Sequence, residues 1–271
     1  MSQVSRYRGI GLLTGPYGSA VYPSGVLTWS SEDTFEIGST TFVCRPMEGR
    51  FASEPGRFCL LKPRHEVDWY ERFLRDRAPR TIFEVGSYDG ASSAFFAEIA
   101  RPATLVTIDR RPTPSPALID FIERRGFGAV MSAYCGVDQG DAPRLREILD
   151  ETFGDTVLDL VVDDASHLVE PTRATFNCLF PRLAAGGTYL IEDWSWAHSG
   201  MGATDTWADQ RPLTSVIFEL ILACACRPKV VSNVNVFKNY TLVERGPAAI
   251  DPESFDLASC FGPRDAALIS E

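Results

Sequence analysis

Acidic side chains and a histidine follow two strand-like apolar segments of the sequence, where they could hold a metal ion. Asp163, Asp164 and His167 come directly after one apolar run, and Glu192 and Asp193 come after the next. Neighbouring strands of a sheet lie about 4.8 Å apart, so side chains at their ends can converge. Carboxylates that face one another are costly to keep ionised unless a cation lies between them. Because the acidic groups offer oxygen ligands, the pattern predicts Mg²⁺ rather than zinc.

The same residues indicate acid–base chemistry on an alcohol. A bound divalent ion lowers the pKa of a hydroxyl and orients it as a nucleophile. His167 comes three residues after Asp164, and imidazole, with an ordinary pKa of about 6.5, is suited to remove that proton near neutral pH. The alternative is that Asp163, Asp164 and Ser166 are loop and cap residues ahead of a helix. Capping does not explain the histidine or the second acidic pair.

A glycine turn after an earlier apolar run predicts a cofactor site. Gly86 and Gly90 allow a sharp turn and a close approach of the backbone to a ligand. Their G-x-x-x-G spacing differs from the G-x-G-x-x-G of dinucleotide sites. Glu84 would repel phosphate, and Asp109 ends the next apolar run, where an acid can accept the hydroxyls of a ribose. S-adenosylmethionine, which carries a ribose and a positive charge but no phosphate, fits these features, although a glycine turn alone is common in α/β domains.

Alternating strand and helix patterns place these residues at the carboxyl ends of strands. The expected strands cover residues 81–85, 105–108, 129–134, 158–162, 188–191, 230–237 and 240–244. The expected helices lie before Pro79, over residues 91–100, around residues 118–122 and 145–149, after Pro171, and over residues 213–226. This order predicts an α/β fold, a Rossmann-like doubly wound sheet of about seven strands, mostly parallel with one antiparallel strand in a C-terminal hairpin.

One helix of this series has explicit start and stop signals. Pro171 suits the first helical turn, where its missing N–H would be unpaired in any case. The helix is expected to run towards Leu183 and to end at Gly186 and Gly187.

Residues 1–64 differ from the remainder, because they are rich in Gly, Pro, Ser and Thr and show no helical period. They are expected to form an N-terminal extension that serves as a lid or as an oligomerisation arm. Residues 65–271 are expected to form the catalytic domain. A homo-oligomer, with a dimer favoured, is the expected assembly.

Composition and residue spacing disfavour several classes of protein. The 271 residues carry a formal net charge of −10, which disfavours nucleic-acid binding. The longest apolar stretch, residues 216–226, is interrupted by Glu219 and is too short to span a membrane. The seven cysteines show neither a disulfide framework nor a zinc spacing. With no signal-peptide pattern at the start, the expected location is the cytoplasm.

Residues 65–246 resemble the class I S-adenosylmethionine-dependent methyltransferases. Residues 86–94 are similar to the first motif of the catechol O-methyltransferases, which implies that Glu84 and Ser92 bind the methionine end of the cofactor and Asp109 its ribose. Residues 136–139 resemble the segment on the adenine side. The cofactor-binding set expected from this resemblance and the acidic centre is Glu84, Gly86, Ser87, Tyr88, Ser92, Asp109, Asp138, Gln139 and Asp163.

The acidic segments narrow the resemblance. Residues 163–167, 179–183 and 186–193 look like those of the metal-dependent sugar O-methyltransferases, which modify deoxysugars of macrolide-type products and mycobacterial methylated polysaccharides. The resemblance implies Mg²⁺ bound by Asp164, Glu192 and Asp193, with His167 as the general base. Two residues depart from the pattern: Ala165 replaces a usual glycine, and Glu170 replaces a common second histidine.

The sequence therefore predicts a Mg²⁺-dependent transfer of a methyl group from S-adenosylmethionine to a hydroxyl of a sugar or glycoside. Trp194, Trp196 and His198 follow the second acidic pair and are candidate contacts for that acceptor, because a tryptophan face suits the apolar side of a sugar ring. Two other enzymes remain alternatives: a catechol-type O-methyltransferase and, less favoured by the glycine spacing, an NAD-dependent oxidoreductase. A non-catalytic binding subunit is disfavoured by the intact acids and histidine.

Overall fold

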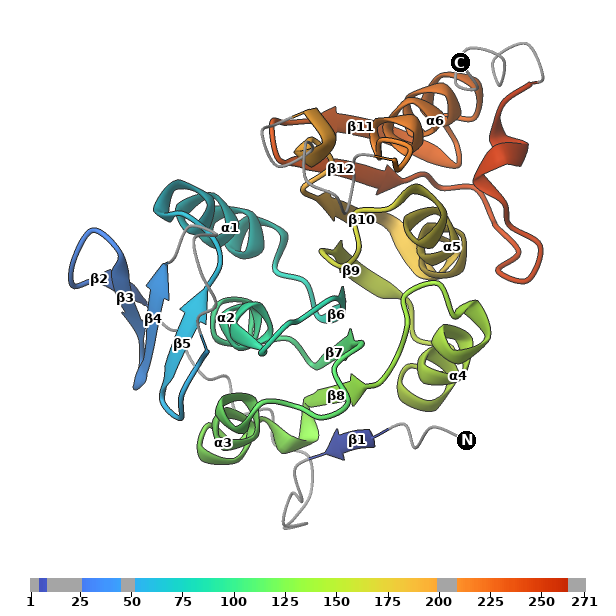
Figure 1. Ribbon diagram of the computed structural model, residues 1–271. Coiled ribbons are helices and arrows are strands. Elements are labelled where there is room, and N and C mark those ends of the chain that lie inside the picture. Colours follow the sequence, from blue (N-terminus) through green and yellow to red (C-terminus); the bar gives the residue numbers. More distant parts are fainter. Residues whose placement is uncertain (1–4, 9–25, 45–51, 199–208, 263–271) are drawn as a thin grey trace. The chain divides into compact units, whose positions relative to one another are not determined.

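The computed structural model describes residues 5–8, 26–44, 52–198 and 209–262, which belong to two units of the chain (Figure 1). The first unit draws on Met1–Thr81 and Ser87–Gly136, and the second on Ile82–Gly86 and Val137–Glu271. The glycine turn that the sequence singles out therefore contains the point where the chain leaves one unit for the other.

The first unit contains a four-stranded sheet, three α-helices and three further strands. Its elements are β1 (Ser5–Arg8), β2 (Leu27–Trp29), β3 (Thr34–Ile37), β4 (Thr40–Cys44), β5 (Arg57–Leu60), α1 (Arg64–Arg77), α2 (Ala91–Ala100), β7 (Thr104–Asp109), α3 (Pro116–Arg124), η1 (Phe127–Ala129) and β8 (Met131–Cys135). The four-stranded sheet has the order β2–β3–β4–β5, and only its β4–β5 pair is parallel. Strand β7 pairs with β8 in parallel, as a βαβ connection through α3 requires.

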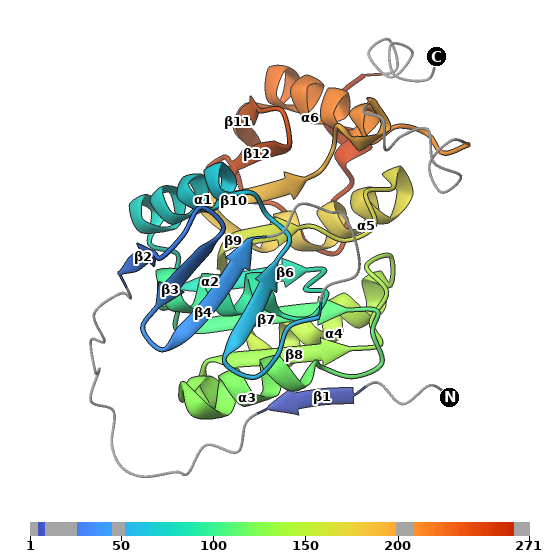
Figure 2. The same cartoon turned by 60° about the vertical axis from the view of Figure 1, so that its left-hand side comes forward.

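The small sheet lies beside α2 and α3 (Figure 2), and a cluster of phenylalanines joins it to these two helices. Phe35 and Phe42 stack with their ring centroids 5.0 Å apart, and both meet the edge of Phe95 on α2. Phe58 on β5 meets Phe121 on α3 at 5.6 Å. All five rings are fully buried. The described part of the N-terminal extension thus shares a hydrophobic core with α2 and α3.

Strand β1 was not expected from the sequence. It pairs antiparallel with β8, with Ser5 opposite Cys135 and Arg8 opposite Ser132. Its four residues show no regular alternation of apolar and polar side chains, so the sequence carries no periodic signal for it. By pairing with β8, the strand provides hydrogen-bond partners for the backbone groups at the β8 edge.

The second unit contains the strands that bear the acidic residues. Its elements are β6 (Thr81–Val85), α4 (Ala142–Thr152), β9 (Leu158–Asp163), α5 (Val169–Leu179), η2 (Phe180–Arg182), β10 (Leu183–Glu192), η3 (Trp196–His198), α6 (Thr214–Cys226), β11 (Val231–Val236), β12 (Tyr240–Arg245) and η5 (Leu257–Cys260). Strands β6, β9 and β10 pair in parallel, whereas β12 is antiparallel to both β10 and β11. Parallel pairing brings the carboxyl ends of β6, β9 and β10 to one edge of the sheet.

The predicted fold class is confirmed. All seven expected strands are present, the core pairs are parallel, and the last two strands form the expected antiparallel hairpin. This is the α/β, Rossmann-like arrangement, with β1 as an addition. No helix in the described part of the chain has the length and apolar character needed to cross a membrane.

One predicted boundary is wrong. Helix α5 ends at Leu179 rather than near Leu183, and Gly186 and Gly187 lie inside β10 instead of ending the helix. Pro181 follows the helix in a short 3₁₀ turn, because proline cannot donate the next helical hydrogen bond. The two glycines instead accompany a register shift between β10 and β9, where a residue without a side chain tolerates the irregular backbone.

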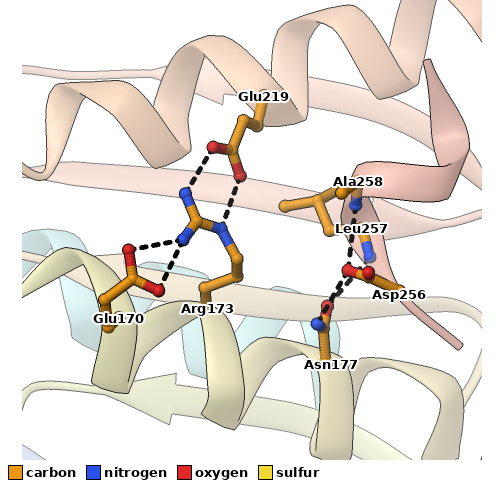
Figure 3. A network of polar contacts seen from close by, with 7 residues as sticks. All are labelled: Glu170, Arg173, Asn177, Glu219, Asp256, Leu257 and Ala258. Carbon is orange, nitrogen blue, oxygen red and sulfur yellow. Dashed lines mark hydrogen bonds and ion pairs between the residues drawn. The ribbon is translucent and has the colours of Figure 1, made fainter. Parts of the chain in front are cut away.

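An ion-pair network fixes α6 against α5 (Figure 3). The guanidinium of Arg173 on α5 donates two hydrogen bonds to Glu219 on α6, at 2.5 and 3.0 Å. It also binds both carboxylate oxygens of Glu170 at 2.8 Å. The Glu219 side chain is 7% exposed and that of Glu170 is 77% exposed, so the two carboxylates that share one arginine differ greatly in solvation. The hydrogen bonds to Glu219 are the first cause of a raised pKa at Arg173.

This difference in solvation predicts unequal effects on stability. Replacing Glu219 by alanine (Glu219→Ala) is expected to lower the free energy of unfolding by about 2 kcal/mol, because it leaves a largely buried charge-assisted donor without its acceptor. The matched control Glu170→Ala is expected to cost less than about 1 kcal/mol, since its pair with Arg173 is exposed. Urea unfolding measures both values. Equal losses for the two variants would contradict the assignment of Glu219 as the structural partner.

Candidate functional site

Three of the predicted residues come together in the second unit. Asp164 and His167 follow β9, and Asp193 follows β10. Each of them offers one ligand atom, and these atoms all lie within 4.8 Å of one another. His167 Nε2 is 4.0 Å from Asp164 Oδ1. The group is half-buried rather than fully exposed, with 27% exposure of the Asp164 side chain and 10% of His167.

The end of β6 fixes the position of Asp164. Its backbone N–H donates to the carbonyl of Val85 at 2.9 Å. The next residue, Gly86, has φ +86°, and a Cβ there would lie 2.3 Å from the carbonyl oxygen of Asp164 and 2.8 Å from Cα of Ala165. Only glycine allows the backbone after β6 to pass this close to the loop after β9. The glycine that the sequence assigns to a cofactor turn therefore also shapes the acidic loop.

The β11–β12 turn fixes the position of Asp193. Its backbone N–H donates to the carbonyl of Asn239 at 2.6 Å. The indole Nε1 of the following residue, Trp194, donates to the carbonyl of Phe237 at 2.8 Å. Both acceptors lie between the two strands of the C-terminal hairpin. The hairpin thus supplies the backbone groups that orient the second carboxylate.

Two of the three converging residues have a strained backbone. Among the described residues, five non-glycine residues have positive φ. Two of these, Ala78 and Arg101, are the C-caps of α1 and α2, where a left-handed residue is ordinary. The other three are Tyr88, His167 and Asp193, with φ of +51°, +56° and +53°. Left-handed conformations outside caps cost free energy and persist where neighbouring contacts impose them, which supports His167 and Asp193 as functional positions.

Asp163 is buried next to this loop and is held by hydrogen bonds. Its carboxylate accepts from Nε2 of Gln139 at 3.0 Å and from the hydroxyl of Tyr189 at 2.9 Å. Burial raises the pKa of Asp163 to about 7, although the bonds from Tyr189 and Gln139 act in the opposite direction. Burial, with the neighbouring Asp163 carboxylate, also raises the pKa of Tyr189. Two protein donors thus bind this carboxyl.

The glycine turn has its own acidic partner in the first unit. The N–H groups of Ser87 and Tyr88 donate to Oδ2 of Asp109 at 3.1 and 2.7 Å, and the N–H of Arg111 donates to Oδ1 at 2.8 Å. The guanidinium of Arg111 lies over the exposed ring of Tyr88, 5.0 Å from its centroid. Asp109 thus holds the glycine turn through backbone N–H groups, and its predicted contact with a ribose stays a prediction.

Asp89 ties this turn to the N-terminal segment. The side chain is buried, and its Oδ2 accepts from the N–H of Ser53 at 2.8 Å. The hydroxyl of Ser115, the N-cap of α3, donates to its backbone carbonyl at 2.5 Å. In the described part of the chain its second oxygen, Oδ1, has no hydrogen-bond partner. The sequence alone does not mark Asp89 as a site residue.

The other predicted residues lie in different surroundings. Glu84 is buried within β6, and Ser92 lies half-buried in the first turn of α2. Asp138 is exposed and accepts from the N–H of Gly140 at 2.9 Å. Glu192 is buried at the end of β10, and it is outside the three-residue group that the described residues form. Its predicted role as a metal ligand stays a prediction, as do the predicted cofactor contacts.

A pocket opens beside Asp193 and His167. The ring of Trp196 lies 4.6 Å from that of His167, between centroids. The lining consists of His167, Asp193, Trp194, Trp196, Ala197, Gln210, Arg211, Pro212 and Leu213. His198 is not among these residues; its Nε2 forms a hydrogen bond with the hydroxyl of Thr214 at the start of α6. The sequence does not indicate residues 210–213 as part of a site, because they form no recognisable motif.

Comparison with known proteins finds similar sequences for the central part of the chain. Residues 83–194 match the family described as a methyltransferase domain, a span that contains every predicted cofactor, metal and catalytic residue. The chain is 40% identical over 80 residues to demethylmacrocin O-methyltransferase of Streptomyces fradiae, covering 29% of this chain and 19% of that protein. It is 43% identical over 56 residues to 8-demethyl-8-alpha-L-rhamnosyl tetracenomycin-C 2'-O-methyltransferase of Streptomyces olivaceus, covering 21% and 14%.

A solved structure shares the fold. The methyltransferase MycE of the mycinamycin biosynthetic pathway, in complex with Mg and SAH, superposes with a TM-score of 0.50 and 24% sequence identity. The match covers 66% of this chain and 49% of MycE. The chain spans less than a third of the length of the curated relatives that it matches.

The close approach at Gly86 yields a direct prediction. Gly86→Ala is expected to lower the free energy of unfolding by about 3 kcal/mol or more, because a left-handed alanine adds to a steric clash with the Asp164 backbone. Gly186 is a matched control, with φ +83° and no described atom within 4 Å of an added Cβ. Gly186→Ala is expected to cost only about 1–2 kcal/mol of backbone strain. Urea unfolding measures the loss of stability in both variants. Similar losses would show that the backbones at Gly86 and Asp164 are not closely packed.

Proposed function

Because residues 83–194 match the methyltransferase-domain family, we propose that this protein transfers a methyl group from S-adenosylmethionine to a hydroxyl of a sugar or glycoside with the help of Mg²⁺. The observation that carries the proposal is the convergence of Asp164, His167 and Asp193 beside a pocket lined by two tryptophans. A relative named for a rhamnosyl-bearing substrate supports a sugar acceptor, and the MycE complex with Mg and SAH supports the two cofactors.

The donor set fits a small divalent cation. Mg²⁺ prefers oxygen ligands such as carboxylates. One oxygen of Asp164 and one of Asp193 lie within 4.8 Å of each other, so a small ion could bind both. When bound, the ion supplies charge that lowers the pKa of a coordinated hydroxyl. Asp164 and Asp193 would hold the ion, with Glu192 as a further proposed ligand.

His167 is the proposed general base. The face of Trp196 beside its ring and the left-handed backbone at His167 limit the orientation of the imidazole. The acceptor hydroxyl gives its proton to the imidazole as its oxygen attacks the methyl carbon. The carbon–sulfur bond breaks, its electron pair returns to sulfur, and S-adenosylhomocysteine leaves. Since the positive charge on sulfur disappears in this step, alignment of oxygen, methyl and sulfur contributes most of the acceleration.

The cofactor contacts are proposed for the glycine turn and its neighbours. Asp109 keeps lone pairs available beside its three backbone donors, so it can accept the hydroxyls of a ribose as well. Trp194 and Trp196 are the proposed acceptor contacts, because aromatic faces suit the apolar side of a sugar ring. A homodimer, a cytoplasmic location, and a lid or assembly role for residues 1–64 remain proposals from the sequence.

Removing the side chain of Asp164 or of His167 is expected to impair catalysis and to leave cofactor binding largely unchanged. His167→Ala is expected to lower kcat by a factor of about 10²–10⁴, because a positioned general base contributes that much. Asp164→Ala is expected to lower kcat as well, because it removes a proposed ligand of the activating ion. S-adenosylhomocysteine binding, measured by calorimetry, is expected to change little. Asp155→Asn, at an exposed position, is the control for removal of one negative charge. Undiminished turnover in both variants would overturn the mechanism.

Metal removal and acceptor choice test the proposed reaction as a whole. Turnover of a glycoside panel in the presence of EDTA is expected to be abolished, and added Mg²⁺ is expected to restore it. S-adenosylhomocysteine binding without metal is expected to remain measurable. The panel includes catechol, the acceptor of the alternative reaction. Methylation of catechol without any glycoside product would contradict the sugar assignment, and full activity in EDTA would contradict the metal requirement.

A further inference from the structure

The side chain of Gln139, after β8, is buried and fully engaged with the loop after β9. Only 4% of the residue is exposed. Its Nε2 donates to Oδ1 of Asp163 at 3.0 Å and to the hydroxyl oxygen of Thr175 at 3.3 Å. Its Oε1 accepts from the backbone N–H of Ser166 at 2.9 Å. Both amide hydrogens and one oxygen lone pair are therefore in use within the second unit.

These contacts fall on both sides of the candidate metal ligand. Asp163 immediately precedes Asp164, and Ser166 immediately precedes His167. One amide group thus fixes the chain at both ends of the segment that carries the carboxylate and the base. His167 has φ +56°, a conformation that neighbouring contacts must impose. The hydrogen bond from the N–H of Ser166 to Oε1 of Gln139 holds the residue directly before this strained position.

We propose that Gln139 is a positioning residue, which holds the loop from Asp164 to His167 in the shape that binds a divalent cation. The inference rests on the proposed function, because it assumes that this loop binds the ion. It differs from the adenine-side role expected from the sequence. The donors of the amide are already taken by Asp163 and Thr175, so Gln139 has none left for a ring nitrogen of adenine.

Tyr189 provides a matched control. Its hydroxyl donates to the other oxygen of Asp163, Oδ2, at 2.9 Å, and its side chain is fully buried. Tyr189→Phe removes an equally buried hydrogen bond to the same carboxylate. It leaves the bond between Gln139 and the N–H of Ser166 in place. A general loss of stability would therefore affect both variants, whereas a loss of loop shape would affect only the change at Gln139.

The experiment measures Mn²⁺ binding to the full chain by electron paramagnetic resonance of the free ion. Gln139→Met is expected to weaken Mn²⁺ binding at least tenfold, the usual minimum effect of removing a residue that orients a metal ligand. Tyr189→Phe is expected to weaken Mn²⁺ binding less than about threefold, although its Tm is expected to decrease about as much as that of Gln139→Met. S-adenosylhomocysteine affinity, measured by calorimetry, is expected to stay within about threefold of the unmodified protein in both. Gln139→Asn, which keeps the amide but shortens its reach, is expected to behave like Gln139→Met and serves if that variant does not fold.

The outcomes distinguish this inference from the proposed function. Unchanged Mn²⁺ affinity in the Gln139 variants, with loss of binding in Asp164→Asn, would overturn the positioning role and leave the metal site intact. Weakened S-adenosylhomocysteine binding with normal Mn²⁺ affinity would overturn it in favour of a cofactor contact. Equal weakening of Mn²⁺ binding in Tyr189→Phe would mean that the effect comes from a general loss of stability, and it would also overturn the positioning role of Gln139. Failure of the unmodified protein to bind Mn²⁺ would overturn both proposals.

Discussion

The contact between the end of β6 and the loop after β9 determines the geometry of the candidate site. The N–H of Asp164 bonds to the carbonyl of Val85, and the bare Cα of Gly86 lies where no Cβ would fit. Close packing of two backbones leaves little freedom to either, because protein interiors resist changes of even one methylene group. The parallel pairing of β6 with β9 brings this crossing about. The acidic loop therefore begins at a position set by the sheet.

Beyond that crossing, separate backbone contacts hold each reacting group. Gln139 binds the loop at Asp163 and Ser166, and the turn between β11 and β12 binds the segment at Asp193. Both His167 and Asp193 adopt left-handed backbone conformations. Strain of this kind lowers the stability of the fold, so its presence at two neighbouring candidate groups agrees with a functional rather than a structural purpose. The ion pair between α5 and α6 supports the same unit from outside the site.

Much of the fold was predictable from the sequence, because apolar runs and helical stripes are local signals. Strand β6 and helix α2 begin and end where the pattern predicts. The end of α5 was not predictable from Gly186 and Gly187, since Pro181 acts first and the glycines serve the register of β10. Strand β1 lacks any periodic pattern, so only its pairing with β8 identifies it.

The candidate site was predictable in its residue types but not in its detailed contacts. Spacing along the chain indicates that Asp164, His167 and Asp193 converge, and the structure brings these three together. Asp193 is oriented by a carbonyl of the hairpin, and the acidic loop is bound by the amide of Gln139. Both contacts exist only in the folded chain. Such contacts between distant parts of the chain leave no motif in a single sequence. The same reason explains why residues 210–213 of the pocket were missed.

The central claim is that the carboxylates after β9 and β10 bind one divalent ion. Anomalous diffraction at the manganese edge, from crystals soaked with Mn²⁺ and S-adenosylhomocysteine, tests this claim most directly. The account predicts a single strong peak between the carboxylates of Asp164 and Asp193. A map with no peak at that position, or with the two carboxylates turned away from each other, would contradict it.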